Sequence, residues 1–239
     1  MAKGASLTLP RKHIPLALGS GALIGTHWLC FFGAVEVSNI SVGLAGFAAT
    51  ALFTALLEPL LARQRPNLGK IILSLLTVAG IVIIAASKTQ VPRAGLGLGL
   101  ALLGAFLASV YSISSKKLVD AKLPGTTLML YQIPSSCLCS GLAILLLPSF
   151  SWQWPQSSDW IPLISLAGFC TFFAYIWYAK LLQSISVYSS NLAFNFEPVY
   201  GMIMAAVFFK EYESLTPSFY LGSAIIVAAN LLHARSPDY

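Results

Sequence analysis

The sequence predicts an all-α membrane protein, a polytopic helical bundle of eight transmembrane helices. Three observations support this fold class. Hydrophobic residues make up 57% of the 239 residues and charged residues only 9%, whereas a soluble domain usually carries about a quarter charged residues. The apolar residues gather in eight long stretches separated by short gaps. These stretches lack the alternating pattern of a membrane β-barrel, so helices are the remaining way to satisfy the backbone in lipid.

Each predicted helix is about 19 to 22 residues long, or roughly 30 Å at 1.5 Å per residue, which matches the hydrocarbon thickness of a bilayer. The first apolar stretch is too long for the core of a cleavable signal peptide. Within it, Gly21 and Gly25 are one turn apart and are expected to allow close helix packing. In chain order, the helices are predicted at residues 14–35, 40–61, 68–87, 95–115, 126–147, 161–182, 189–209 and 216–234.

The basic residues orient the predicted bundle. With the amino terminus in the cytoplasm, only Lys88, Arg93 and Lys210 of the 14 Lys and Arg residues fall on the outer side. Basic residues gather on the cytoplasmic side of membrane proteins. The outer gap 148–160 instead holds three tryptophans and no basic residue, which is typical of an interfacial aromatic belt. We therefore expect a multi-pass protein of the plasma membrane (the bacterial inner membrane) with both termini cytoplasmic.

Glu197, followed directly by Pro198, lies in the otherwise uncharged stretch 189–209. It is roughly 12 Å from the cytoplasmic end of the predicted helix. A carboxylate at that depth is costly unless it faces protein or water, and so is a functional-site hypothesis by default. Pro198 removes a backbone donor and predicts a helix break. We interpret Glu197 as a proton-coupling site or a counter-charge to a cationic substrate. The alternative is a carboxyl group bonded to a neighbouring helix.

Other polar and aromatic residues lie at intermediate depth. Asn191 and Asn195 lie on the same helix, near the face of Glu197. His27 lies near the middle of the first helix, where it either relays a proton or bonds a backbone carbonyl. Each asparagine also has the plainer interpretation of an interhelical hydrogen bond. The remaining candidates for substrate binding or proton coupling are Tyr200, Trp28, Tyr111, Tyr131, Gln132 and Tyr175. Pro134 is predicted to break its helix as Pro198 does.

Glu58 lies one turn from the cytoplasmic end of the predicted helix 40–61, with Arg63 and Arg65 just beyond it. A snorkelling ion pair at the membrane surface is one interpretation of Glu58 and Arg63, and a cytoplasmic gate is the other. The four cysteines lie in apolar stretches without metal-ligand spacing. We therefore expect neither a metal site nor a cofactor.

Two parts of the chain, residues 31–66 and 177–212, resemble each other. Leu52-Phe53 aligns with Val199-Tyr200, and Thr50-Ala51 aligns with Glu197-Pro198. In the predicted orientation the helix 40–61 runs inward and the helix 189–209 runs outward, so the repeats are inverted. Inverted repeats with broken helices near the midplane are typical of secondary transporters.

The second copy resembles the EamA-like family of the drug/metabolite transporter superfamily. The resemblance rests on Glu197-Pro198-Val199-Tyr200, Lys210-Glu211 and the small residues between Gly222 and Ala229. It implies ten helices in two inverted repeats of five. Residues 91–239 supply five helices of one repeat, whereas residues 1–90 supply three. The resemblance thus implies that this chain lacks the first two helices of the ten-helix plan, in a 3 + 5 arrangement.

The leading functional hypothesis is a secondary-active transporter of a small organic metabolite, working by efflux or exchange, with proton coupling as one mode. No cluster of intramembrane Lys or Arg appears, which argues against phosphate-bearing substrates. The alternatives are a membrane-embedded lipid-modifying enzyme and an inactive fragment of a longer transporter. The expected partners are the lipid bilayer and a small-molecule solute, with no nucleic acid, and the sequence leaves monomer and homodimer open.

Overall fold

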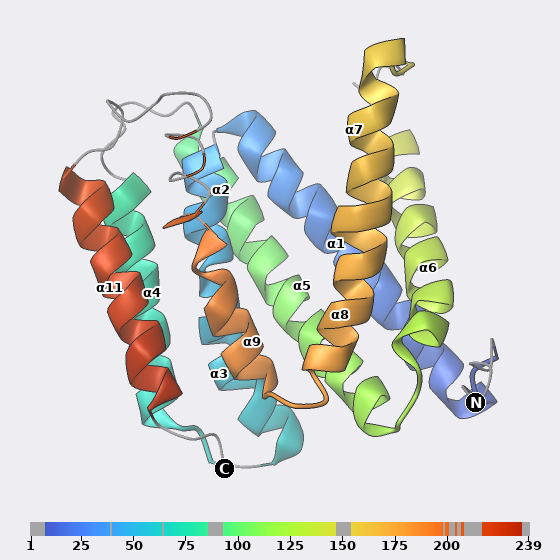
Figure 1. The fold of residues 1–239 in the computed structure, drawn as a ribbon, viewed down its shortest axis with the longest axis horizontal. Coiled ribbons are helices and arrows are strands. Elements are labelled where there is room, and N and C mark those ends of the chain that lie inside the picture. The colour runs from blue at the N-terminus through green and yellow to red at the C-terminus, as the bar shows by residue number, and fades with distance from the viewer. Residues whose placement is uncertain are drawn as a thin grey trace. The chain divides into compact units, whose positions relative to one another are not determined.

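The computed structural model describes residues 8–38, 40–63, 65–85, 93–146, 154–197, 199–200, 204, 207 and 217–235. Within these ranges the regular elements are helices, and no strand occurs. A helix occupies at least part of each of the eight predicted stretches (Figure 1). The all-helical fold class is therefore confirmed for the described part of the chain, whereas the number of transmembrane helices stays a prediction.

The first half of the described chain contains a 3₁₀ turn and five helices. They are η1 (Arg11–His13), α1 (Ile14–Val37), α2 (Ile40–Phe47), α3 (Ala49–Ala62), α4 (Leu68–Ala85) and α5 (Ala94–Asp120). The second half contains α6 (Gly125–Leu145), the 3₁₀ turn η2 (Ser157–Asp159), α7 (Trp160–Ser165), the π-helix η3 (Leu166–Phe173), α8 (Ala174–Leu181), α9 (Val187–Phe194) and α11 (Pro217–Ala234).

Four helical stretches among the described residues are long and apolar enough to cross a membrane. They are Arg11–Val37, Val42–Leu61, Ala94–Asp120 and Ser157–Leu181. Shorter apolar helices cover Leu68–Ile84 and Tyr220–Ala234. The last of the four long stretches is composite, because the π-helix η3 joins α7 to α8 (Figure 1). Within η3 the hydroxyl of Thr171 donates to the carbonyl of Leu166, five residues earlier, at 2.9 Å.

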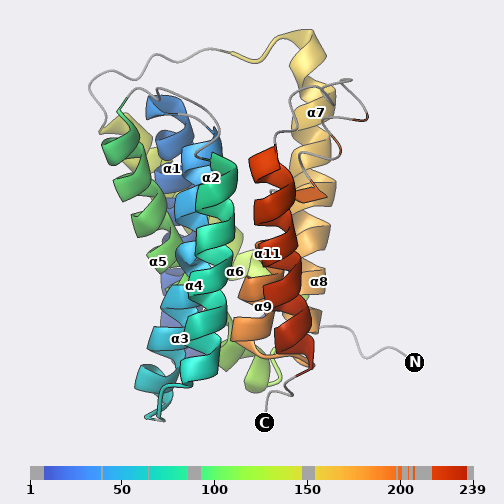
Figure 2. The same ribbon diagram turned by 90° about the vertical axis from the view of Figure 1, so that its left-hand side faces the viewer.

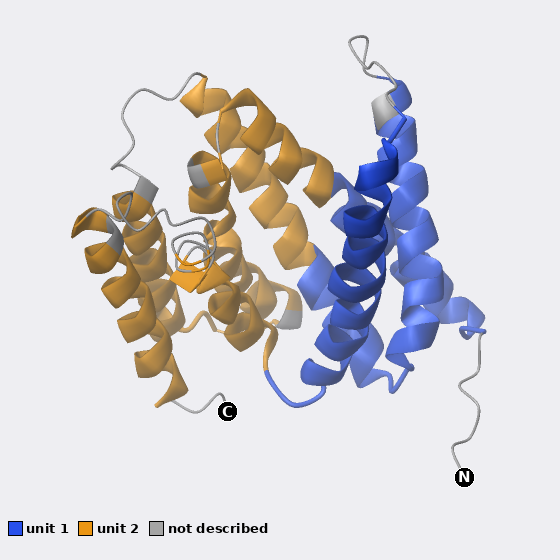
Figure 3. Ribbon diagram, turned by 45° about the horizontal axis from the view of Figure 1, so that its top comes forward, with its two compact units in different colours: residues 1–26, 111–185 blue, residues 27–110, 186–239 orange. Residues whose placement is uncertain are grey.

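The chain forms two compact units (Figure 3). Unit 1 contains Met1–Thr26 and Tyr111–Ile185, and unit 2 contains His27–Val110 and Ser186–Tyr239. Each unit therefore draws on both predicted repeats. The assignment of residues 1–90 and 91–239 to two repeats stays a prediction.

In unit 1, α1 packs closely against α6 through the two glycines that the sequence singled out. A Cβ atom on Gly21 would lie 2.8 Å from the Cα atom of Gln132, and one on Gly25 would lie 2.7 Å from the carbonyl oxygen of Ser136. Ser140 adds a hydrogen bond from its hydroxyl to the carbonyl of Gly25, at 3.3 Å. Small residues let helix backbones approach in lipid, where apolar side chains gain little by leaving the tails. The close packing predicted at Gly21 and Gly25 is confirmed.

Pro134 does not break its helix. The helix α6 runs without interruption from Gly125 to Leu145, with Pro134 inside it. The predicted break at this position is therefore wrong. A proline removes one backbone donor, and membrane helices tolerate that loss where neighbouring groups satisfy the freed carbonyl.

In unit 2, α4 and α11 lie side by side (Figures 1 and 2). Their backbones meet at Gly80 and Gly222, because a Cβ atom on Gly80 would lie 2.9 Å from the carbonyl oxygen of Gly222. Around this crossing, a buried apolar cluster joins α2, α4 and α11, and it consists of Ala45, Ala48, Ile81, Ile84 and Ile226.

We predict that Gly222→Leu destabilises the pairing of α4 with α11. The leucine side chain has no room beside Gly80, and overpacking of this kind costs about 1–3 kcal/mol. Helicity measured by circular dichroism during titration with sodium dodecyl sulfate should show a lower unfolding midpoint. Gly141→Leu is the matched control, since a Cβ atom on Gly141 meets nothing within 4 Å. Equal midpoints for the two variants would contradict the prediction.

Candidate functional site

The helix that carries Glu197 is interrupted directly ahead of it. The helix α9 ends at Phe194, and Asn195 and Phe196 form a turn. The amide of Asn195 donates to the carbonyl of Leu192 at 3.0 Å, and the amide of Phe196 donates to that of Ala193 at 3.1 Å. Both bonds span three residues, as in a 3₁₀ turn that tightens a helix end. Helices usually end at or before the residue that precedes a proline, and Pro198 itself lies outside the described residues.

The predicted site residue Asn191 is buried in a hydrogen-bonded cluster that joins three helices. Its side-chain amide donates to the hydroxyl of Thr54 on α3 at 2.7 Å. The hydroxyls of Thr54 and Ser109, on α5, lie 2.9 Å apart. Because Thr54 gives its only proton to the carbonyl of Thr50, at 2.8 Å, Ser109 is the donor to Thr54. Asn191, Thr54 and Ser109 are each at most 1% exposed.

Asn195 makes a second buried contact from the same helix face. Its side-chain amide donates to the hydroxyl of Thr77 on α4 at 3.2 Å, and Thr77 donates to the carbonyl of Ser74 at 2.8 Å. At the start of α9, the hydroxyl of Tyr188 donates to the carbonyl of Lys70 at 2.7 Å. The buried side of α9 is thus held at three levels along unit 2. Both asparagines take the interhelical role that the sequence left open.

Glu197 and Tyr200 lie beyond this buried segment, and both side chains are exposed. The amide of Tyr200 donates to the carbonyl of Phe196 at 3.1 Å, so a helical turn resumes after the interruption. Residues 201–203 lie outside the described residues. The role of Glu197 in proton coupling therefore stays a prediction.

His27 lies in a buried aromatic setting in unit 2. Its Nδ1 atom is 2.9 Å from the carbonyl oxygen of Gly104 on α5, and because a carbonyl only accepts, Nδ1 carries the proton. Its ring centroid lies 5.2 Å from that of Phe47 and 6.3 Å from that of Phe31. This is the bond to a backbone carbonyl that the sequence left as one of two interpretations. Trp28, the next residue, is half-buried.

Unit 1 brings three of the predicted residues together. The side-chain amide of Gln132 donates to the hydroxyls of Ser20, at 2.8 Å, and Ser115, at 3.3 Å. Ser115 also bonds the hydroxyl of Tyr111, and the ring centroid of Tyr111 lies 6.1 Å from that of Tyr175. Tyr178, which was not predicted, stacks on Tyr111 at 6.5 Å. Tyr131 is half-buried and accepts a hydrogen bond from the amide of Leu9 at 3.3 Å.

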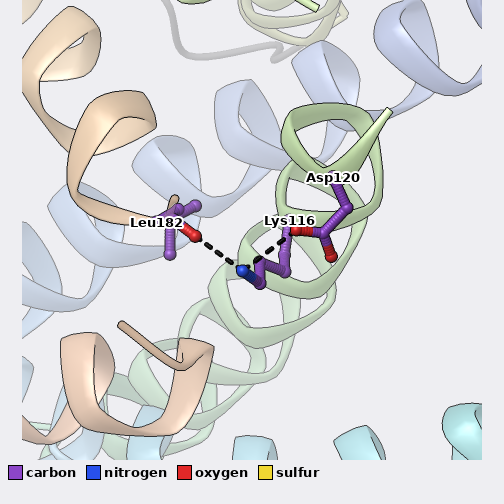
Figure 4. A network of polar contacts seen from close by, with 3 residues as sticks. All are labelled: Lys116, Asp120 and Leu182. Atoms are coloured by element: carbon purple, nitrogen blue, oxygen red, sulfur yellow. Dashed lines mark hydrogen bonds and ion pairs between the residues drawn. The ribbon is translucent and has the colours of Figure 1, made fainter. Parts of the chain in front are cut away.

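Lys116 on α5 binds the backbone just after the end of α8 (Figure 4). Its ammonium group donates to the carbonyl of Leu182 at 2.7 Å and lies 3.0 Å from the Oδ1 atom of Asp120. A cation at a helix carboxyl end binds the carbonyls that lack helical partners. Lys116 therefore stabilises the end of the helix that carries Tyr175 and Tyr178.

Glu58 is half-buried on α3, and Arg63 is exposed at the end of that helix. Arg63 adopts a left-handed conformation, with φ of 54°, and its amide donates to the carbonyl of Leu60. The choice between an ion pair and a gate for Glu58 and Arg63 stays a prediction.

Sequence reasoning missed the hydroxyl partners of the predicted residues. They are Thr54, Thr77 and Ser109 in unit 2, and Ser20 and Ser115 in unit 1. The only local signal for them is a hydroxyl group in an apolar helix. Such hydroxyls commonly bond across helices or back to their own backbone.

Comparison with known proteins identifies the family of this chain. The sequence profile of the EamA-like transporter family matches residues 95–234, more than half of the chain. The chain belongs to the EamA-like transporter family. Membership makes it a multi-pass membrane protein of a transporter family of the drug/metabolite type. The resemblance stated from Glu197-Pro198 and the residues after it is thereby confirmed.

Solved structures support the fold of this EamA-like protein. Ten chains match it, and one of them, described only as "Crystal structure of protein", has a TM-score of 0.74. The match covers 98% of this chain and 80% of the solved chain, at 21% identity. At that identity the likeness concerns the fold alone. No curated protein matches.

We predict that Asn191→Leu destabilises unit 2 by about 1 kcal/mol, in the range measured for hydrogen bonds between membrane helices. The substitution keeps the volume and removes the donor to Thr54. A double-mutant cycle with Thr54→Val, read from unfolding midpoints in sodium dodecyl sulfate, isolates this bond. Asn230→Leu is the matched control, because the side-chain amide of Asn230 donates within its own helix, to the carbonyl of Ile226 at 3.0 Å. Additive effects of Asn191→Leu and Thr54→Val would count against the bond.

Proposed function

We propose that this EamA-like protein is a secondary-active transporter that moves a small organic metabolite by efflux or exchange, with Glu197 as the proton-coupling carboxyl group. One observation carries the proposal. The helix α9 is anchored by two buried asparagine amides and then interrupted at Asn195 and Phe196, immediately before the only carboxylate of the stretch 189–209. Interrupted helices near the midplane are where secondary transporters bind substrates and coupling ions.

The hydrogen bonds of the two asparagines fix the position of the backbone just ahead of Glu197. Asn191 and Asn195 hold α9 to α3 and α4, so the turn after Phe194 begins from a fixed place in unit 2. Glu197 and Tyr200 are exposed on the far side of that turn. A carboxyl group in an apolar span favours its neutral form, and a water-filled cavity favours its charged form. When Glu197 moves between an apolar and a water-filled environment, its carboxyl group would then bind and release one proton.

The proposed plan has eight transmembrane helices in inverted repeats of three and five. The alignment of Leu52-Phe53 with Val199-Tyr200 supports the inverted repeats. Inverted repeats are typical of secondary transporters.

The aromatic group of unit 1 suits a neutral or amphipathic solute. Tyr111, Tyr175 and Tyr178 provide ring faces, and the hydroxyls and amide around Gln132 provide hydrogen-bonding groups. Ligand sites in proteins combine apolar and aromatic walls with a few placed polar groups. We place the protein in the plasma membrane with both termini cytoplasmic, as the basic residues indicate.

Proton flux in proteoliposomes tests the proposal. Purified protein is reconstituted with a pH-sensitive dye inside, a pH gradient is imposed, and a panel of neutral amino acids, nucleobases and monovalent organic cations is added in turn. We expect at least one solute to dissipate the gradient. Glu197→Gln should abolish this flux, because the glutamine cannot release a proton, whereas Glu197→Asp should retain part of it.

Glu36→Gln is the matched control, since Glu36 is an exposed carboxylate on α1 and its loss should leave proton flux unchanged. Unchanged flux in Glu197→Gln would remove this residue from the mechanism. Solute uptake without proton movement would replace proton coupling by plain exchange.

A further inference from the structure

A pocket lies where the stretch Ser157–Leu181 of unit 1 begins, and residues of α7 form part of its lining. Its volume is about 420 Å³, and it is lined by Trp154, Pro155, Asp159, Pro162, Leu163 and Leu166. None of the residues that the sequence assigned to transport lines it. The pocket is therefore separate from the residues proposed for transport, and its ligand is considered separately.

Asp159 places a carboxylate in this pocket in a fixed orientation. The amide of Gln156 donates to its Oδ2 atom at 2.9 Å, and the hydroxyl of Ser158 donates to its Oδ1 atom at 3.4 Å. Gln156 and Asp159 together form a reciprocal cap on the turn. A carboxylate offers about four lone-pair sites, so two bonds leave acceptor capacity for a ligand. The side chain is exposed, and it is the only charged residue of the segment 148–160.

The walls beside the carboxylate are aromatic and apolar. Trp154 is 77% exposed, and Leu163 and Leu166 are 42% and 56% exposed. An indole face attracts a cation through its quadrupole, and a neighbouring carboxylate attracts the same cation through its charge. The combination is selective for an ammonium group. The carboxylate repels an anion, and the segment 148–160 contains no Lys or Arg to offset its charge.

The position of the pocket favours a lipid headgroup as the source of this ammonium group. Ser157–Leu181 is long and apolar enough to cross a membrane, and Asp159 lies in its first turn. Tryptophans at the ends of such helices sit at the level of the lipid headgroups. Leu163 and Leu166, one and two turns further in, then face the upper part of the acyl chains. At that depth the lining residues would span the headgroup level and the upper acyl chain of one lipid molecule.

We propose that this pocket binds the ammonium headgroup of phosphatidylethanolamine, with Asp159 and Trp154 as the recognition residues. The ammonium group lies between the carboxylate and the indole, the phosphate stays toward water, and an acyl chain covers Leu163 and Leu166. The lipid is held as a structural partner, independently of the transported solute.

Native mass spectrometry of the purified protein tests this site. The protein is incubated with equal amounts of phosphatidylethanolamine and phosphatidylglycerol that have identical acyl chains. Phosphatidylglycerol carries a neutral glycerol in place of the ammonium group and is therefore an anion. We expect phosphatidylethanolamine to be retained in preference. Asp159→Asn and Trp154→Leu should each reduce its retention about fivefold, the scale of an exposed cation–π or ionic contact. Phosphatidylglycerol retention should not fall.

Two further variants separate recognition from folding. Asp159→Glu keeps the charge and should keep the preference, and Glu36→Gln removes a carboxylate elsewhere and should behave as the wild type. Equal retention of the two lipids by the wild type would overturn the proposal. So would unchanged phosphatidylethanolamine retention in both Asp159→Asn and Trp154→Leu.

Discussion

The hydrogen bond from Asn191 to Thr54 is the contact on which the arrangement of unit 2 around Glu197 depends. In the hydrocarbon region no water is available as a hydrogen-bond partner, so the side chain of Asn191 must bond to a group on another helix. Asn191 meets this requirement through Thr54 and Ser109, which joins α9 to α3 and α5. Asn195 repeats the solution with Thr77 on α4. The turn that leads to Glu197 therefore starts from a helix whose rotation and depth are fixed.

Close backbone contacts complete what these bonds begin. In unit 1, Gly21 and Gly25 allow α1 to pack closely against α6. In unit 2, Gly80 and Gly222 allow α4 to pack closely against α11. A glycine at such a crossing brings carbonyls and small hydroxyls within reach of the next helix, as Ser140 on Gly25 illustrates. Packing and hydrogen bonding are thus two aspects of the same requirement, since apolar side chains gain little by leaving lipid for protein.

The sequence predicted the features that depend on local composition. Apolar length located the helices, and Gly21 with Gly25 anticipated a close crossing. The helix break at Pro198 stays a prediction, since Pro198 lies outside the described residues. Pro134 was misread, because a proline breaks a membrane helix only where the surroundings leave its missing bond uncompensated. The partners Thr54 and Thr77 could not be predicted, since nothing local distinguishes a hydroxyl that faces another helix from one that bonds its own backbone.

The π-helix η3 has a consequence for the tyrosines that follow it. Its bonds span five residues, whereas those of α7 and α8 span four, so the angular phase of α8 is offset from that of α7. Tyr175 and Tyr178, which follow η3 on α8, meet Tyr111 in this offset phase. A helical wheel drawn through 161–182 would place them on another face. The wider winding of Leu166–Phe173 thus offsets the residues that follow it, and it affects which side chains of this span face Tyr111.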